Sequence, residues 1–167
     1  GEGQGLHKII PEAANRLGED FIFRIIGDGG LKIKLEEAIK NSKCKNVELL
    51  NPVNRNRLIE YYRQSDYLFL HLNDYNAFKK VLPSKIFEYA AFNKPIIAGV
   101  SGFASLFIKK NIKNVLVFNP LDSDFFVSNI NSLEINGPLR TDFIKYFSRK
   151  EINSKMADSI LKNFSNK

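Results

Sequence analysis

The sequence predicts an α/β protein built on a Rossmann-like, doubly wound parallel sheet with helices on both faces. Short apolar runs recur along the chain between residues 21 and 119, and helical patterns lie between them. The runs are almost continuously apolar, which is typical of parallel strands covered on both faces. Regular alternation of such strands with helices favours an open, doubly wound sheet. We expect strands at Phe21–Gly27, Val47–Leu50, Tyr67–Leu72, Pro95–Gly99 and Val115–Asn119.

Helices are predicted from apolar residues spaced three and four apart. The clearest helix covers residues 6–17, whose apolar residues fall on one face. Others are expected around Leu31–Ile39, Leu58–Tyr62 and Ser84–Ala91. After Gly137-Pro138 the apolar spacing becomes helical again, in a cluster and then at every fourth residue: Phe143, Ile144 and Phe147, then Ile152, Met156, Ile160 and Phe164. We therefore predict two terminal helices in residues 139–167 that pack on the domain formed by residues 1–138.

Length and charge limit the classes of function. A chain of 167 residues with 44% hydrophobic content suffices for one sizeable core. The net charge of +7 favours anionic partners, but the basic residues are scattered and lack the aromatic–basic pattern of nucleic-acid modules. Nucleic acid is therefore not an expected partner. The single cysteine, Cys44, excludes an internal disulfide, and no apolar run approaches the ~18 residues of a membrane span. We expect a cytoplasmic protein.

No metal site is predicted. His7 lies in an amphipathic helical pattern, where we expect it to be exposed, and it is far in sequence from His71. Asp122-Ser123-Asp124 has the form of an Asp-x-Asp metal motif, but it stands where a helix should begin. Helix capping explains these acids.

The stretch from Leu82 to Ala91 carries the most specific chemistry. It reads as a loop followed by a helix, with Pro83 fixing φ and Ser84 offering a side-chain oxygen to the amides of the first turn. Lys85 stands beside those amides, and Glu88 lies about one turn further on. Free amides and a lysine suit a phosphate, whereas a carboxylate suits sugar hydroxyls. This combination predicts a nucleotide-sugar site.

Weaker signals lie at other predicted strand ends and turns. Glycine-rich turns precede helices at Gly5 and at Gly27-Asp28, but neither matches a dinucleotide or P-loop fingerprint. They either let the backbone approach a phosphate or serve tight turns alone. His71 and Asn73 follow a strand, where α/β proteins place ligands, with a purely structural histidine as the alternative.

The run Leu82–Ala91, with Asn93–Ala98 after it, resembles the donor-site signature of GT-B glycosyltransferases. The most similar group is the retaining family-four type of bacterial polysaccharide and O-antigen assembly. Phe23–Gly29 resembles the family's strand and Gly-Asp-Gly turn, Asn46–Leu50 the strand before the nucleobase loop, and Leu58–Asp66 the helix and turn that follow. The resemblance covers roughly residues 1–135. It implies the carboxyl-terminal, donor-binding half of a GT-B fold, taken from an enzyme whose amino-terminal domain binds the acceptor.

The resemblance also implies a set of donor-site residues. Glu88 corresponds to the family's ribose ligand, and the others expected around the donor are Lys85, Ser84, Pro83, Leu82, Gly5, Gly27, Asp28, Val53, Leu58, His71 and Asn73. Two positions depart from the family pattern. Lys80 stands where relatives carry a first, sugar-facing glutamate, and Gln4 stands where many carry a lysine. The catalytic residue is therefore left unassigned.

The expected activity follows from the same resemblance. The donor would be a UDP- or GDP-linked sugar, the acceptor a lipid-linked glycan, and no cofactor or metal would be needed. We expect the fragment to be inactive alone and to associate weakly with the anionic inner face of the cytoplasmic membrane. One alternative is a GT-B-fold epimerase or hydrolase of nucleotide sugars, which needs more acids and histidines at its cleft. Another is a non-catalytic nucleotide-binding module.

Overall fold

The computed structural model describes residues 2–165 and contains each of the expected strands. They form two parallel sheets in place of the single sheet that the sequence predicts. The pairs are β1–β2 in one sheet and β3–β4–β5, with β4 central, in the other. The strands are β1 (Phe23–Ile26), β2 (Val47–Leu50), β3 (Leu68–His71), β4 (Ile96–Gly99) and β5 (Val115–Phe118).

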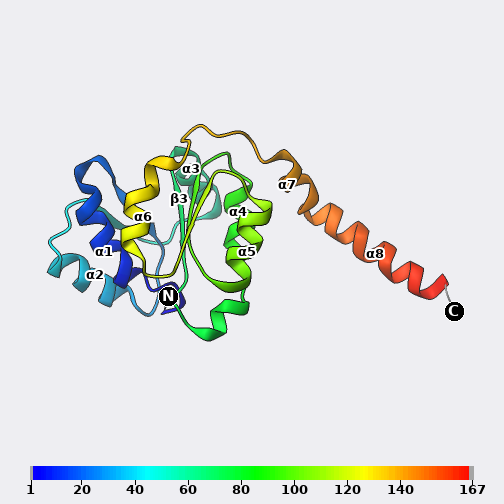
Figure 1. Cartoon of the computed structure of the whole chain (residues 1–167), viewed down its shortest axis with the longest axis horizontal. Helices are drawn as coiled ribbons and strands as arrows, with labels where there is room; N and C mark the ends of the chain where they lie inside the picture. Colours follow the sequence, from blue (N-terminus) through cyan, green and yellow to red (C-terminus); the bar gives the residue numbers. More distant parts are fainter. Residues whose placement is uncertain (1, 166–167) are drawn as a thin grey trace.

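Helices alternate with the strands along the chain, as the sequence predicts (Figure 1). The α-helices are α1 (Leu6–Leu17), α2 (Lys32–Asn41), α3 (Arg55–Gln64), α4 (Lys85–Ala90), α5 (Gly102–Asn111), α6 (Ser123–Asn129), α7 (Thr141–Tyr146) and α8 (Arg149–Ser165). Short 3₁₀ helices are η1 (Glu2–Gln4), η2 (Gly18–Asp20), η3 (Asn76–Lys80) and η4 (Ile130–Ser132).

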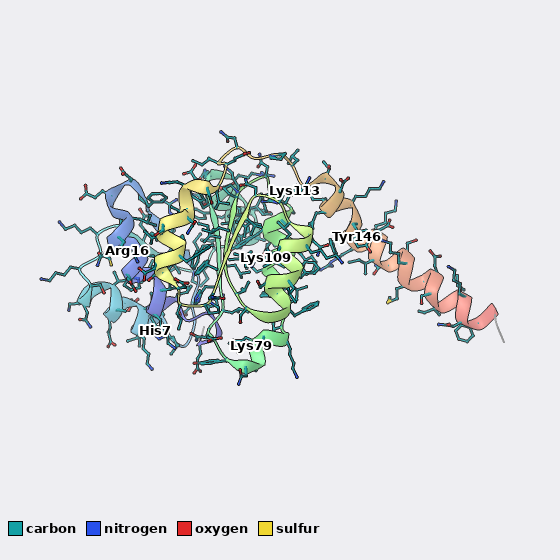
Figure 2. All side chains as sticks on the ribbon, in the orientation of Figure 1. His7, Arg16, Lys79, Lys109, Lys113 and Tyr146 are labelled. Atoms are coloured by element: carbon teal, nitrogen blue, oxygen red, sulfur yellow. The ribbon has the colours of Figure 1, made fainter. Side chains whose placement is uncertain are left out.

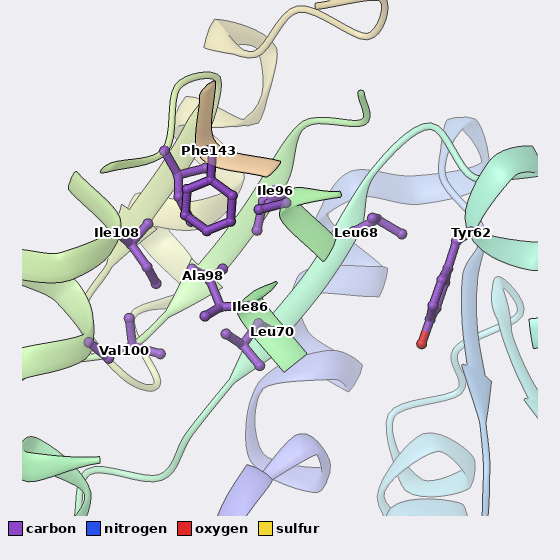
Figure 3. Close-up of a cluster of buried hydrophobic side chains, with 12 residues drawn as sticks. Tyr62, Leu68, Leu70, Ile86, Ile96, Ala98, Val100, Ile108 and Phe143 are labelled. Atoms are coloured by element: carbon purple, nitrogen blue, oxygen red, sulfur yellow. The ribbon is translucent and has the colours of Figure 1, made fainter. Parts of the chain in front are cut away.

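Helices cover both faces of the three-stranded sheet. On one face α1 and α6 pack against alternate strand residues, among them Ile97 and Phe118. On the other face α4 and α5 pack against Ile96 and Ala98, the neighbours of Ile97 on β4 (Figure 3). Successive residues of β4 therefore enter opposite cores. Each fully buried isoleucine or phenylalanine side chain contributes about 1.5–3 kcal/mol to the stability of the fold. This arrangement confirms the doubly wound α/β fold.

The last two helices differ in how they contact the domain. On α7, Phe143 stacks with Phe87 of α4 at a centroid distance of 6.1 Å, and just after α7, Phe147 meets Phe87 edge-on at 5.4 Å. The helix α8 instead extends away from the domain (Figure 1), and the apolar side chains on it are 47–74% exposed: Ile152, Met156, Ile160, Leu161 and Phe164. Among the described residues, α7 and Phe147 thus contact the domain, whereas the large apolar side chains of α8 are exposed.

A buried arginine holds the segment that leads into α7. The guanidinium of Arg140 donates to the carbonyls of Phe92, Lys94, Lys113 and Asn114. These carbonyls lie where α4 has ended and where β4 and β5 begin. Burial lowers the pKa of Arg140, which nonetheless stays charged at any physiological pH. Arg140 therefore fixes the point from which α7 and α8 leave the sheet.

Candidate functional site

Three loops meet at the carboxyl end of β3 through one histidine. His71 Nδ1 lies 2.6 Å from the Gln4 carbonyl, and the Leu121 amide donates to His71 Nε2 at 3.0 Å. Because a carbonyl only accepts, Nδ1 carries the proton and Nε2 does not. Burial lowers the pKa of His71, which agrees with this neutral form. Both ring nitrogens are engaged, so His71 joins loops, and its contact with the donor stays a prediction.

Asn73 also holds the amino-terminal loop, residues 2–5. Its backbone amide donates to the Gly3 carbonyl at 2.8 Å, and its Nδ2 donates to the Glu2 carbonyl. The side chain is 1% exposed, and its Oδ1 has no hydrogen-bond partner within the described residues. Gly5 has φ +58°, and a Cβ there would lie 2.1 Å from Oδ1. Gly5 and Asn73 thus set the shape of the 2–5 loop.

A carboxylate held between two cations lies where α3 and α4 meet. Glu88 Oε2 is 3.1 Å from Lys85 Nζ, and Oε1 is 3.4 Å from Arg55 Nη1. The Glu88 side chain is half-buried at 23% exposure. Each carboxylate oxygen has two lone-pair directions, so both retain capacity for a hydroxyl donor. This geometry suits the vicinal hydroxyls of a ribose.

Lys85 is held by a second partner. Its Nζ donates to Tyr62 Oη at 3.0 Å as well as pairing with Glu88. Burial opposes the charge of the ammonium, but the hydrogen bonds to Tyr62 and Glu88 outweigh burial and raise the pKa of Lys85. Lys85 is therefore a cation at neutral pH. One of its three N–H donors is left for a ligand.

The first turn of α4 differs from the sequence prediction. Ser84 occupies the N-cap position, but its side chain makes no capping hydrogen bond. The amides of Ile86 and Phe87 already donate to the carbonyls of Pro83 and Ser84, at 3.1 Å each. Two of the amides that were predicted to be free for a phosphate are therefore already hydrogen-bonded, because the turn closes with i→i+3 bonds. The side chain of Lys85 is left as the main group for an anion.

A small cavity of about 90 Å³ lies between α1, β1 and α2. Of the expected residues, Gly27 and Asp28 line it, together with Gln4 and His7. His7 is half-buried there, contrary to its expected exposure, and burial together with Lys8 lowers its pKa. Pockets for whole small-molecule ligands usually measure about 300–1,000 Å³. The cavity alone is therefore too small for a nucleotide sugar.

The remaining expected residues contribute little direct chemistry. Leu58 and Leu82 pack against the buried cluster of Figure 3, and Val53 is half-buried. The other expected residues divide into a group on and just before α4, a loop group at β3 and two residues, Gly27 and Asp28, at the cavity.

The acidic motif after β5 is a helix cap. Asp122 accepts from the Phe125 amide at 2.9 Å, and Asp124 bonds to Arg16. The predicted capping role is confirmed. Within residues 2–165, no group of three or more His, Cys, Asp or Glu side chains is placed to hold a metal ion.

The sequence analysis did not predict two residues that contact Glu88 and Lys85. Arg55 and Tyr62 reach Glu88 and Lys85 from another helix, 33 and 23 residues away along the chain. Only their positions on α3, the helix expected to follow the nucleobase loop, offered a signal.

The chain matches the family model described as glycosyl transferases group 1 over residues 3–150. It belongs to this family. No curated protein matches it. Among solved structures it is similar to AviGT4, a glycosyltransferase involved in avilamycin A biosynthesis, with a TM-score of 0.70 at 12% identity. The match covers 100% of this chain and 50% of AviGT4, so the chain spans half the length of that structure.

Membership of a glycosyl transferase family accords with the α/β fold, in which ligands lie outside the carboxyl ends of the strands. None of the helices within residues 2–165 has the length and apolarity needed to cross a membrane.

Proposed function

We propose that the chain is the carboxyl-terminal, donor-binding half of a retaining glycosyltransferase of the hexosyltransferase type. The donor would be a UDP- or GDP-linked sugar. The acceptor would be a lipid-linked glycan in the synthesis of a bacterial surface polysaccharide or O-antigen. The proposal extends the family's general activity to a named donor class and acceptor class.

The observation that supports the proposal most is the arrangement around Glu88. Its two oxygens are oriented by Arg55 and Lys85, at 3.4 and 3.1 Å, and are ready to accept from two ribose hydroxyls. The ammonium of Lys85 lies on the same helix and offers charge to a diphosphate. In glycosyl transfer the diphosphate leaves with its negative charge, so a fixed cation lowers the barrier. Donor binding and leaving-group stabilisation would thus come from one helix.

The acceptor would be bound by a separate amino-terminal domain. AviGT4 is about twice as long as the matched region, and the match includes α8. An apolar stripe on α8, formed by Ile152, Met156, Ile160 and Phe164, is exposed in this chain. Amphipathic helices normally bury such a stripe against another element. We assign it to the acceptor domain, and we expect this half alone to bind donor without transferring sugar.

A weak membrane association would place the enzyme near a lipid-linked acceptor. The net charge of +7 attracts anionic lipid, at about 1 kcal/mol per basic residue close to the surface. Figure 2 shows Lys79, Lys109 and Lys113 spread along the side of the domain that carries η3 and α5, so these charges do not gather in one patch. The attraction would accordingly be weak and sensitive to salt.

Calorimetric titration with UDP, GDP and their 2′-deoxy analogues tests the donor proposal. The wild-type chain should bind one of the two nucleotides and prefer it to its deoxy analogue. Glu88→Ala should weaken binding by about 1–3 kcal/mol, as expected for lost hydrogen bonds to a charged group. It should also remove most of the preference for the 2′-hydroxyl.

Glu60→Ala is the matched control, because Glu60 also pairs with an arginine, Arg57, but lies in an exposed pair on α3. Its affinity should equal that of the wild type. A wild-type chain that ignores both nucleotides at millimolar concentration would refute the proposal. Equal behaviour of the two variants would remove Glu88 from the site.

A further inference from the structure

We infer that Tyr62 is a positioning residue whose hydroxyl fixes the ammonium of Lys85 beside Glu88, in the orientation that meets the donor diphosphate. Tyr62 would not touch the donor itself. The inference rests on the proposed donor site and adds a residue from α3 to it.

The position of the Tyr62 hydroxyl is set by the packing of its ring. Tyr62 lies in the last turn of α3 and is 6% exposed. The rings of Tyr89 and Phe92 meet it edge-on, with centroids 5.3 and 5.4 Å away and interplanar angles of 83° and 76°. Figure 3 shows Tyr62 at the border of the buried cluster. Because the phenol oxygen is rigidly attached to the ring, this packing fixes where the oxygen lies.

The Lys85 side chain needs such a fixed partner. A lysine has four flexible bonds and loses much of its rotamer entropy when it is immobilised. In the structure Tyr62 Oη, at 3.0 Å, and Glu88 Oε2, at 3.1 Å, hold the ammonium from two sides. The ring centroid of Tyr89 lies 5.8 Å from Nζ, within cation–π range.

Two held donors leave the third N–H of Lys85 with a defined direction. The Lys85 side chain is 38% exposed, so that N–H is reachable from solvent. A phosphate oxygen could take it without breaking the bonds to Tyr62 and Glu88. The lysine would then bind the diphosphate without a new loss of rotamer freedom, which is the benefit of preorganisation. Removing the hydroxyl of Tyr62 should remove part of that benefit.

The test compares Tyr62→Phe with Tyr89→Phe in calorimetric titrations with UDP, GDP, uridine and guanosine. Tyr62→Phe keeps the ring and loses only the hydroxyl that accepts from Lys85. Tyr89→Phe is the control: Tyr89 packs beside Tyr62 and presents its ring, not its hydroxyl, to Lys85. Tyr62→Phe should weaken the better-binding nucleotide about three- to tenfold, the range for one hydrogen bond. The affinity of Tyr62→Phe for the nucleosides should stay within about twofold of the wild type. The affinity of Tyr89→Phe for both nucleotides should also stay within about twofold.

A double-mutant cycle separates positioning from a general effect on the fold. In a Lys85→Ala background, Tyr62→Phe should change nucleotide affinity by less than about twofold, because its target is gone. The pKa of Lys85, followed by NMR of its side chain without ligand, should fall in Tyr62→Phe. An unchanged pKa, or an equal loss of affinity in both backgrounds, would overturn the inference.

The outcomes also distinguish the inference from the proposed function. If Lys85→Ala weakens nucleotide binding and Tyr62→Phe does not, the donor site stands and the positioning role is wrong. If the wild type binds neither nucleotide, the proposed function fails and the inference fails with it.

Discussion

Replacing Gly5 with alanine should destabilise the protein well beyond the usual penalty for a left-handed residue. Gly5 has φ +58° and precedes α1, and a Cβ there would lie 2.1 Å from Oδ1 of Asn73. The left-handed backbone costs an L-residue about 1–2 kcal/mol. The methyl would also displace Asn73 and break its bond to the Glu2 carbonyl, at about 0.5–1.5 kcal/mol. We expect Gly5→Ala to lower the free energy of unfolding by about 1.5–3.5 kcal/mol.

The matched control is Gly5→Ala in an Asn73→Ala background, where the obstructing side chain is absent. In that background Gly5→Ala should show the backbone cost alone, about 1–2 kcal/mol. The difference between the two backgrounds measures the clash with Asn73.

Urea unfolding at pH 7.5, followed by circular dichroism, gives both free energies. The cost of Gly5→Ala should be larger in the wild-type background than in the Asn73→Ala background by about 0.5–1.5 kcal/mol, because only the wild type carries the obstructing side chain. Equal costs in the two backgrounds would refute the reasoning.

Three further predictions concern other parts of the molecule. Arg140→Ala should lower the free energy of unfolding by about 2–4 kcal/mol, because four part-buried backbone carbonyls lose a charged donor, and Arg140→Lys should recover part of it; a loss under about 0.5 kcal/mol in urea would contradict this. His71 has a pKa depressed below 6.5 in the folded state, so its contribution to stability is complete above pH 6.5 and is lost as pH falls below that value. The urea midpoint of the wild type should fall between pH 7.5 and 5.5, and it should fall less in His71→Asn. An equal fall in the two proteins would contradict this prediction. Sedimentation with vesicles should show binding only to anionic lipid and only at low salt, and binding to neutral vesicles at high salt would point to an apolar anchor instead.

The strands were predictable because each is an almost uninterrupted apolar run. Residues such as Ile96 and Ile97 enter opposite cores, so neither face of β4 tolerates a polar residue. The division into two sheets was not predictable, because pairing depends on contacts between distant segments. No local period distinguishes a strand that pairs with β3 from one that pairs with β2.

Part of the candidate site follows from local spacing. Lys85 and Glu88 stand three apart on one helix, which places them side by side, and the structure shows their ion pair at 3.1 Å. Arg55 and Tyr62 come from α3, and their contacts depend on how two helices pack. Loop contacts set the roles of His71 and Asn73. The sequence placed both at a strand end but gave no sign that the 2–5 loop would cover them.

The terminal helices show how far an apolar pattern can be interpreted. The four-residue spacing from Ile152 to Phe164 predicts a helix with one apolar face, and α8 has that face, but the spacing is silent about what covers it. Phe143 and Phe147 have a partner because Arg140 fixes the preceding segment to the sheet, next to Phe87. Helices of about 15 residues are only marginally stable in water without tertiary packing. The 17 residues of α8 with an exposed stripe therefore call for a second surface, which is the physical ground for assigning the stripe to an acceptor domain.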